Sequence, residues 1–135
     1  MKKDIEIPKV ENVYLAVVHD YNKIFKTNDW NVYLINDKDV AIEMVLIISK
    51  GFDEVGSLGR ETAQMRHKVE LLPAKSAIKI EFMQDEVLAL DNEFKITFFV
   101  NNRLQDKTFL IKKNSVKVAA QRMIKLLNKK GVLIK

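Results

Sequence analysis

The sequence of 135 residues contains no cysteine, and this absence excludes several kinds of site. Without thiols the chain cannot form a disulfide framework, a thiolate metal site or a thiol nucleophile. A lack of cysteine also suits a reducing compartment. The first ten residues, MKKDIEIPKV, have no apolar run behind their lysines and so do not resemble a secretory signal peptide. We therefore expect a cytoplasmic protein.

Proline and glycine are scarce, with two and four copies, and the chain has no long apolar run. The longest one, Val13 to Val18, is far shorter than the roughly 20 residues of a membrane-spanning helix, so we expect no membrane contact. No repeat, low-complexity tract or Pro/Gly-rich linker divides the chain. Its 47% apolar and 30% charged residues are typical of globular proteins, so we expect a single domain over residues 1–135.

Alternating apolar and polar residues recur through residues 1–113, as expected for β-strands with one buried face. The polar residues Asn36 to Asp39 predict a hairpin between the second and third strands, and Asp85 to Leu90 fit either a helical turn or a crossing connection. Short, closely spaced strands favour a mainly β fold, an immunoglobulin-like antiparallel β-sandwich. We predict about seven strands: six over residues 13–18, 30–35, 40–49, 62–71, 78–82 and 94–100, and a seventh that follows the turn 101–103 and ends near Lys112.

The period changes in residues 114–135, where the pattern predicts one C-terminal amphipathic α-helix followed by a tail. At about 100° per residue, the apolar side chains of this segment fall within an arc of about 160°. Polar residues can cap its start, and Gly131 offers the positive φ that closes a helix. A helix with such an apolar side must bury it, and we expect it to dock near Val45 and Ile47.

Basic residues concentrate at the end of the chain. From Arg103 onward there are 10 Lys or Arg residues against one acid, a net charge of +9, whereas residues 1–102 carry −4. Such a segment can attract phosphate or an acidic surface, or it can simply form a solvated face. The candidate partner-binding patch comprises Arg103, Lys112, Lys113, Lys117, Arg122, Lys125 and Lys129.

Residues for metal binding or catalysis are few. The only histidines are His19 and His67, and neither an HxxxH spacing nor a glycine-rich nucleotide motif is present, so we predict no metal and no cofactor. His67 alternates with apolar neighbours, which favours a hydrogen-bonded histidine at the edge of the core over a catalytic base. If the protein is an enzyme, we expect its site to use His67 with Arg66, Lys68 or a carboxylate from residues 52–61.

Four stretches carry a resemblance: IEIPKVENVYLAVV, WNVYLINDKD, MVLIISKGF and RHKVELLPAKSAIKIE. Together they resemble a family of small, uncharacterised bacterial proteins, some of which are labelled as a phenylalanyl-tRNA synthetase subunit. A synthetase catalytic domain holds ATP, an amino acid and the tRNA end, and it needs arginines placed against phosphates. This chain has four arginines, so the resemblance implies a coherent fold and adds no catalytic residue.

Two functional hypotheses follow. The pattern of strands, turns and one amphipathic helix favours a non-catalytic binding or protein-interaction module, whose partner is another protein or a second copy of the chain. The alternative is an RNA-associated protein that uses the basic C-terminal helix to contact phosphates.

Overall fold

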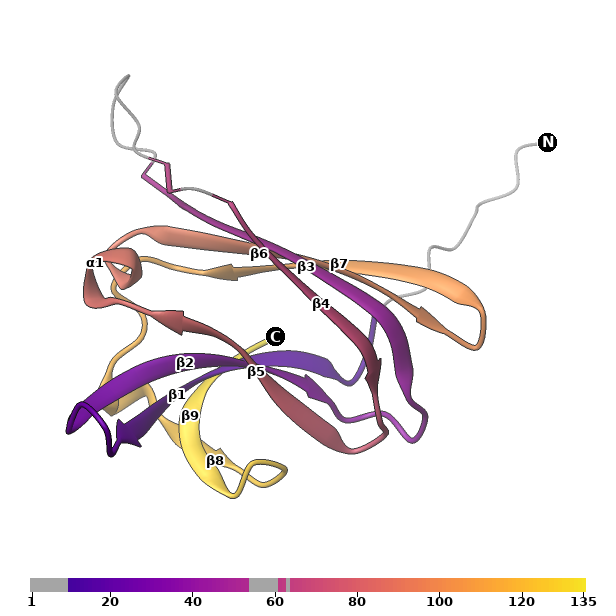
Figure 1. Ribbon diagram of the computed structural model, residues 1–135, viewed down its shortest axis with the longest axis horizontal. Helices are drawn as coiled ribbons and strands as arrows, with labels where there is room; N and C mark the ends of the chain where they lie inside the picture. The colour runs from indigo at the N-terminus through magenta and orange to yellow at the C-terminus, as the bar shows by residue number, and fades with distance from the viewer. Residues whose placement is uncertain (1–9, 54–60, 63) are drawn as a thin grey trace.

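Two antiparallel β-sheets face each other in the computed structural model, which describes residues 10–53, 61–62 and 64–135 (Figure 1). Sheet A has the strand order β5-β2-β1-β9-β8 and sheet B the order β4-β3-β6-β7, so the predicted mainly β, two-sheet architecture is confirmed. The strands are β1 (Val13–Asn22), β2 (Thr27–Asn36), β3 (Ile42–Phe52), β4 (Met65–Leu72), β5 (Ser76–Met83), β6 (Asp91–Val100), β7 (Arg103–Ile111), β8 (Arg122–Ile124) and β9 (Lys129–Ile134). The helical elements are α1 (Asp85–Leu88) and the 3₁₀ turn η1 (Val118–Ala120).

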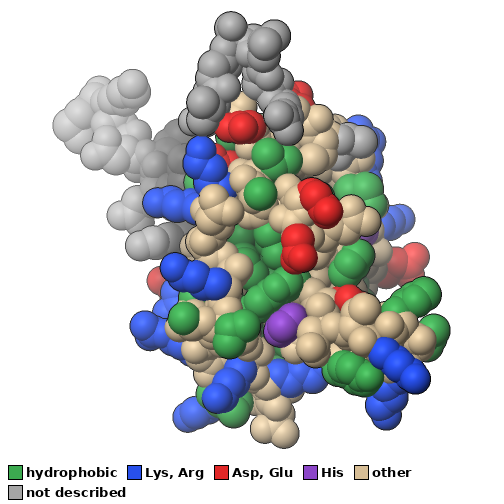
Figure 2. Space-filling model, turned by 90° about the vertical axis from the view of Figure 1, so that its left-hand side faces the viewer, with side chains coloured by type: hydrophobic (Ala, Val, Ile, Leu, Met, Phe, Trp, Pro, Cys, Tyr) green, Lys and Arg blue, Asp and Glu red, His purple; other side chains and the backbone are tan. Residues whose placement is uncertain are grey.

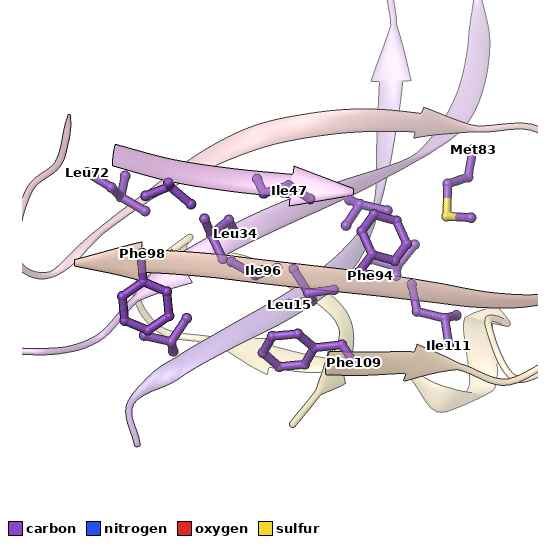
Figure 3. Packing of buried hydrophobic residues seen from close by; sticks show 14 of the residues in the cluster. Leu15, Leu34, Ile47, Leu72, Met83, Phe94, Ile96, Phe98, Phe109 and Ile111 are labelled. Carbon is purple, nitrogen blue, oxygen red and sulfur yellow. The ribbon is translucent and has the colours of Figure 1, made fainter. Parts of the chain in front are cut away.

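The hydrophobic core fills the space between the two sheets (Figure 3). Alternate residues of β6 and β1 point inward, as the two-residue period predicts, and Phe94 and Phe98 of β6 belong to the same core cluster as Leu15 of β1. These side chains are fully buried. Each buried side chain of this size stabilises the fold by roughly 1.5–3 kcal/mol.

The connections between strands differ from the prediction at one place. The predicted hairpin between β2 and β3 is wrong, because β2 lies in sheet A and β3 in sheet B. The buried side chain of Asn36 explains the crossing: its Nδ2 donates to the carbonyl oxygens of Val40, Leu72 and Pro73 at 3.0–3.1 Å. The end of β2 is thereby joined to the turn between β4 and β5. Residues Asp85 to Leu90 prove to contain α1 within the connection from β5 to β6.

A β-bulge in β3 interrupts the alternation of its two faces. Met44 has a φ of 48°, and the register against β6 shifts between Glu43 and Leu46. As a result Val45 and Ile47 point into the sandwich and are fully buried, whereas Met44 and Leu46 are exposed. The expectation that Val45 and Ile47 form an outer docking surface is therefore wrong.

The predicted C-terminal helix over residues 114–135 is also wrong. The segment forms η1 and the β8–β9 hairpin, and β9 pairs antiparallel with β1 from Leu15 to Val18. This pairing satisfies backbone groups along the edge of an apolar strand, which an isolated helix would leave open. Within the described residues, no helix has the length and apolar character needed to cross a membrane.

The β8–β9 hairpin buries apolar side chains on a sheet face, as the predicted helix was expected to do. Ile124 packs on the outer face of sheet A against Ala16, Val18 and Ile35, and Figure 1 shows the hairpin curling beneath that sheet. Gly131 permits this close approach, since a Cβ there would stand 3.0 Å from the Ile124 Cδ1 and Val18 Cγ2 atoms. Gly131 thus serves close packing within β9 and ends no helix.

Candidate functional site

A hydrogen-bonded network lies on the outer face of sheet A, beside the C-terminal hairpin. The Asp20 Oδ2 atom accepts hydrogen bonds from Asn31 Nδ2 at 3.0 Å and from the Tyr33 hydroxyl at 2.8 Å. The Asp20 Oδ1 atom accepts from Lys129 Nζ at 2.9 Å. The alternation of β1 and β2 brings the first three residues to one face, and the pairing of β9 with β1 adds the lysine.

Burial and hydrogen bonding shift the pKa values in this network so that each group keeps its ionisation state at neutral pH. Burial alone would raise the pKa of Asp20, but hydrogen bonds from Lys129, Tyr33 and Asn31 and the lysine charge outweigh it and lower the pKa. Burial and the neighbouring Asp20 carboxylate raise the pKa of Tyr33. The hydrogen bond to Asp20 raises the pKa of Lys129 against the effect of burial. At neutral pH the network therefore holds one carboxylate, one ammonium and one neutral phenol.

Two hollows open on either side of Asp20. The first has a volume of about 700 Å³ and lies between the β1–β2 turn, the start of β2 and the end of β5. Four large apolar side chains surround it, and they stay exposed: Tyr21 (59%), Ile24 (85%), Phe25 (74%) and Phe82 (53%). Surfaces of this kind mark sites of interaction with other molecules.

The local sequence fixes the turn that carries two of these side chains. The Asn22 Oδ1 atom accepts hydrogen bonds from the backbone N–H groups of Ile24 and Phe25 at 3.0 and 3.1 Å. Lys26 then takes a φ of 53° to re-enter β2. The Asn22 side chain thereby holds the backbone of this apolar turn in place.

The second hollow, of about 580 Å³, is more polar and lies between Tyr33, Lys79, Gln121, Lys129 and Lys130. We call the surface formed by the two hollows the lysine–aromatic face. Its residues are Asp20, Tyr21, Lys23, Ile24, Phe25, Asn31, Tyr33, Lys79, Phe82, Lys129 and Lys130.

The charged side chains on and beside the lysine–aromatic face differ in whether they have partners within the chain. Asp20 is held by three donors, and Asp29, at the edge of the first hollow, accepts from Asn22 Nδ2 and Thr27 Oγ1. By contrast, Lys79 and Lys130 form no ion pair with the described part of the chain. The face therefore presents free positive charge beside exposed apolar surface.

The structure separates the seven basic residues that the sequence groups into one patch: Arg103, Lys112, Lys113, Lys117, Arg122, Lys125 and Lys129. Arg103 begins β7, a strand of nine residues that spans roughly 26 Å at about 3.3 Å per residue, whereas Lys112 follows its far end. Lys113 and Lys117 lie in the connection to β8, Arg122 and Lys125 in β8 and its turn, and Lys129 in the Asp20 network. Only Lys129 belongs to the lysine–aromatic face. The helix that was expected to present Lys117, Arg122, Lys125 and Lys129 is absent, and η1 and the β8–β9 hairpin take its place.

Figure 2 views the end of the molecule that carries α1 and the β1–β2 turn. Lys and Arg side chains lie mainly along the left of this view, and several acidic side chains lie near its centre and upper part. Hydrophobic side chains form a strip between them and gather again at the lower right. This end of the molecule therefore combines exposed apolar surface with charges of both signs.

A second polar cluster joins the two sheets at the edge formed by β4 and β5. The Glu81 Oε1 atom accepts a hydrogen bond from Ser49 Oγ at 2.6 Å and lies 2.8 Å from His67 Nε2. The prediction of a hydrogen-bonded His67 at the core edge is confirmed. Its partner is Glu81. The carboxylates of the enzymatic hypothesis belong to residues 52–61, of which residues 54–60 lie outside the described part.

The geometry of this cluster differs from that of an activated nucleophile. Ser49 and His67 both bond the same carboxylate oxygen, whereas a base-activated serine bonds the histidine itself. The other histidine, His19, stacks on Trp30 with ring centroids 4.3 Å apart. Among the described residues, no three His, Asp or Glu side chains are grouped to hold a metal ion. We interpret the Glu81 cluster as a structural link between the sheets.

The residues of the lysine–aromatic face were missed at the level of sequence, apart from Lys129. A signal was present at the β1–β2 turn, where Ile24 and Phe25 stand between Lys23 and Lys26. Two large apolar residues at a turn tip cannot both be buried in the core, and this local conflict marks an exposed contact.

Comparison with protein family models, with curated proteins and with solved structures finds no match to this chain. The resemblance to the family of small bacterial proteins therefore stays a prediction.

Proposed function

We propose that the chain is a non-catalytic protein-interaction module that acts in the cytoplasm and binds its partner on the lysine–aromatic face. One observation carries the proposal: Tyr21, Ile24, Phe25 and Phe82 remain exposed around a single hollow. Burial of each such side chain at an interface contributes roughly 1.5–3 kcal/mol before the costs of association are counted.

The rigidity of the face supports binding. Asp20 fixes Asn31, Tyr33 and Lys129 beneath the hollows, and Asn22 fixes the apolar tip. A surface that is already ordered loses little conformational entropy when a partner binds. Each of these three side chains already donates a hydrogen bond to Asp20, so the network serves to position the surface.

An RNA-associated function has less support. The basic helix that it required is replaced by η1 and the β8–β9 hairpin. The Asp29 carboxylate lines the first hollow and forms no ion pair with the described residues, so it would repel a phosphate backbone there.

We also propose that the two-sheet sandwich has the immunoglobulin-like arrangement of strands. In that fold, the strands A, B and E are neighbours in one sheet and the strands C, F and G in the other. The orders β1-β2-β5 and β3-β6-β7 follow this arrangement, and β4 lies beside β3 as an added strand does in variable-type domains. β8 and β9 extend sheet A beyond β1.

Site-specific photo-crosslinking in cells tests the proposed function. A benzophenone amino acid replaces Phe25 or Phe82 in separate variants, and the exposed apolar residues Leu104 and Val118 supply matched control positions. Irradiation should yield one discrete protein adduct from positions 25 and 82, identified by mass spectrometry, and none from the controls. Equal labelling at all four positions, or none at positions 25 and 82, would overturn the proposal.

A further inference from the structure

Among the residues that the structure describes, the strand β5 forms one edge of sheet A. It is the terminal strand of the order β5-β2-β1-β9-β8 and pairs only with β2. In the described part of the chain, no other strand pairs with its second side. Unpaired backbone N–H and C=O groups on such an edge can hydrogen-bond to a strand from another molecule.

Phe82, near the end of β5, lies between surfaces of opposite charge. On one side it lines the first hollow of the lysine–aromatic face together with Lys79. On the other it lines a hollow of about 310 Å³ whose charged residues are Asp29, Asp85 and Glu86. The edge therefore carries positive charge before Phe82 and negative charge after it.

This arrangement is self-complementary. When two copies of β5 pair antiparallel about Phe82, Lys79 of one copy and Asp85 of the other, the first residue of α1, flank the same end of the paired stretch. By symmetry the two opposite charges come near one another at both ends. The two Phe82 side chains become cross-strand neighbours, in reach of one another.

We propose that the partner bound at this edge is a second copy of the chain, related by a twofold axis through the paired β5 strands. The inference rests on the proposed function, because it names the partner of the lysine–aromatic face. A β-bulge opposite Val32 and Tyr33 bends β5 at Ile80, so the backbone pairing centres on Glu81 to Met83. The charged contacts of Lys79 and Asp85 flank this short paired stretch.

Analytical ultracentrifugation of the full chain over a range of concentrations tests the inference. The wild-type chain should convert from monomer to dimer. Reversal of one charge, in Lys79→Glu or Asp85→Lys, places like charges together twice and should raise the dissociation constant about tenfold or more. The double variant Lys79→Glu/Asp85→Lys should recover wild-type association, and Lys112→Glu, away from the edge, should leave it unchanged.

The outcomes separate the inference from the proposed function. A chain that stays monomeric at every concentration, or a dimer that the double variant does not restore, would overturn the inference. Fluorescence of Trp30 in each variant shows whether the fold is retained, since this single tryptophan is buried. If positions 25 and 82 cross-link only to a different protein, the twofold dimer is wrong while the proposed function stands.

Discussion

Removal of the Asp20 carboxylate should destabilise the fold more than removal of any exposed acid. In Asp20→Ala, the Asn31 amide and the Tyr33 hydroxyl lose their acceptor and Lys129 loses its ion pair. The Asp20 side chain is only 20% exposed, so water cannot replace it freely. The change therefore tests whether the floor of the lysine–aromatic face is held together by this one group.

The magnitude follows from the burial of each partner. Asn31 is buried, and a buried donor without a partner costs about 1–3 kcal/mol. Lys129 is 49% exposed, so the loss of its ion pair is discounted for solvent screening to at most about 1 kcal/mol. With a smaller loss at Tyr33, we expect the free energy of unfolding to fall by about 2–4 kcal/mol at neutral pH.

The pH dependence has a defined sign. Because the pKa of Asp20 is lowered in the folded state from 3.8, its stabilisation is complete above that pH and is lost as the pH falls through the folded pKa. The difference in unfolding free energy between the wild-type chain and Asp20→Ala should therefore be constant from neutral pH to mild acid and should narrow below 3.8.

Urea unfolding followed by the fluorescence of buried Trp30 measures this difference. Asp39→Ala is the matched control, because the Asp39 side chain is 95% exposed and pairs with Lys75 only at 3.7 Å. The control should change the free energy of unfolding by less than about 0.5 kcal/mol. Equal losses in the two variants, or a difference that does not narrow in acid, would refute the reasoning.

Three further predictions concern the sheets. Gly131→Ala should lower the free energy of unfolding by about 1–3 kcal/mol, seen as a lower melting temperature, because the new Cβ would crowd side chains of β8 and β1. Glu81→Leu should cost about 1–3 kcal/mol in urea unfolding by leaving the Ser49 hydroxyl and the His67 ring without their acceptor, and Glu81→Gln should cost less. Deletion of residues 114–135 should give an unfolded or aggregated chain in size-exclusion chromatography, since it uncovers the outer face of sheet A and an edge of β1; a stable monomer would contradict this.

The sequence correctly predicts strands in which apolar and polar residues alternate without interruption. In β6 the alternation of Phe94, Ile96 and Phe98 with polar residues follows directly from burial of one face, and all three are buried. The bulge at Met44 was not predictable in this way, because a single residue of positive φ leaves the composition of β3 unchanged while it exchanges the two faces.

The C-terminal segment shows where periodicity alone fails. Its apolar residues satisfy a helical period, but some of them, such as Val116, pack against the main core, whereas Ile124 packs on the outer face of sheet A. The deciding contact is the pairing of β9 with β1, more than a hundred residues earlier in the chain. The periodicity of the C-terminal segment cannot show that β1 has an unpaired edge with which this segment can pair.

The same separation in sequence explains why the candidate site was missed. Asp20 and Lys129 stand 109 positions apart, and no local sequence pattern connects the two. Once β9 covers β1, the bond between them ties the C-terminal hairpin to the floor of the lysine–aromatic face. β9 thus pairs with β1, whereas β5 has no second partner strand in the described part of the chain, and the exposed apolar side chains lie beside β5. An edge left unpaired next to a fixed apolar surface is the arrangement expected where a second molecule binds.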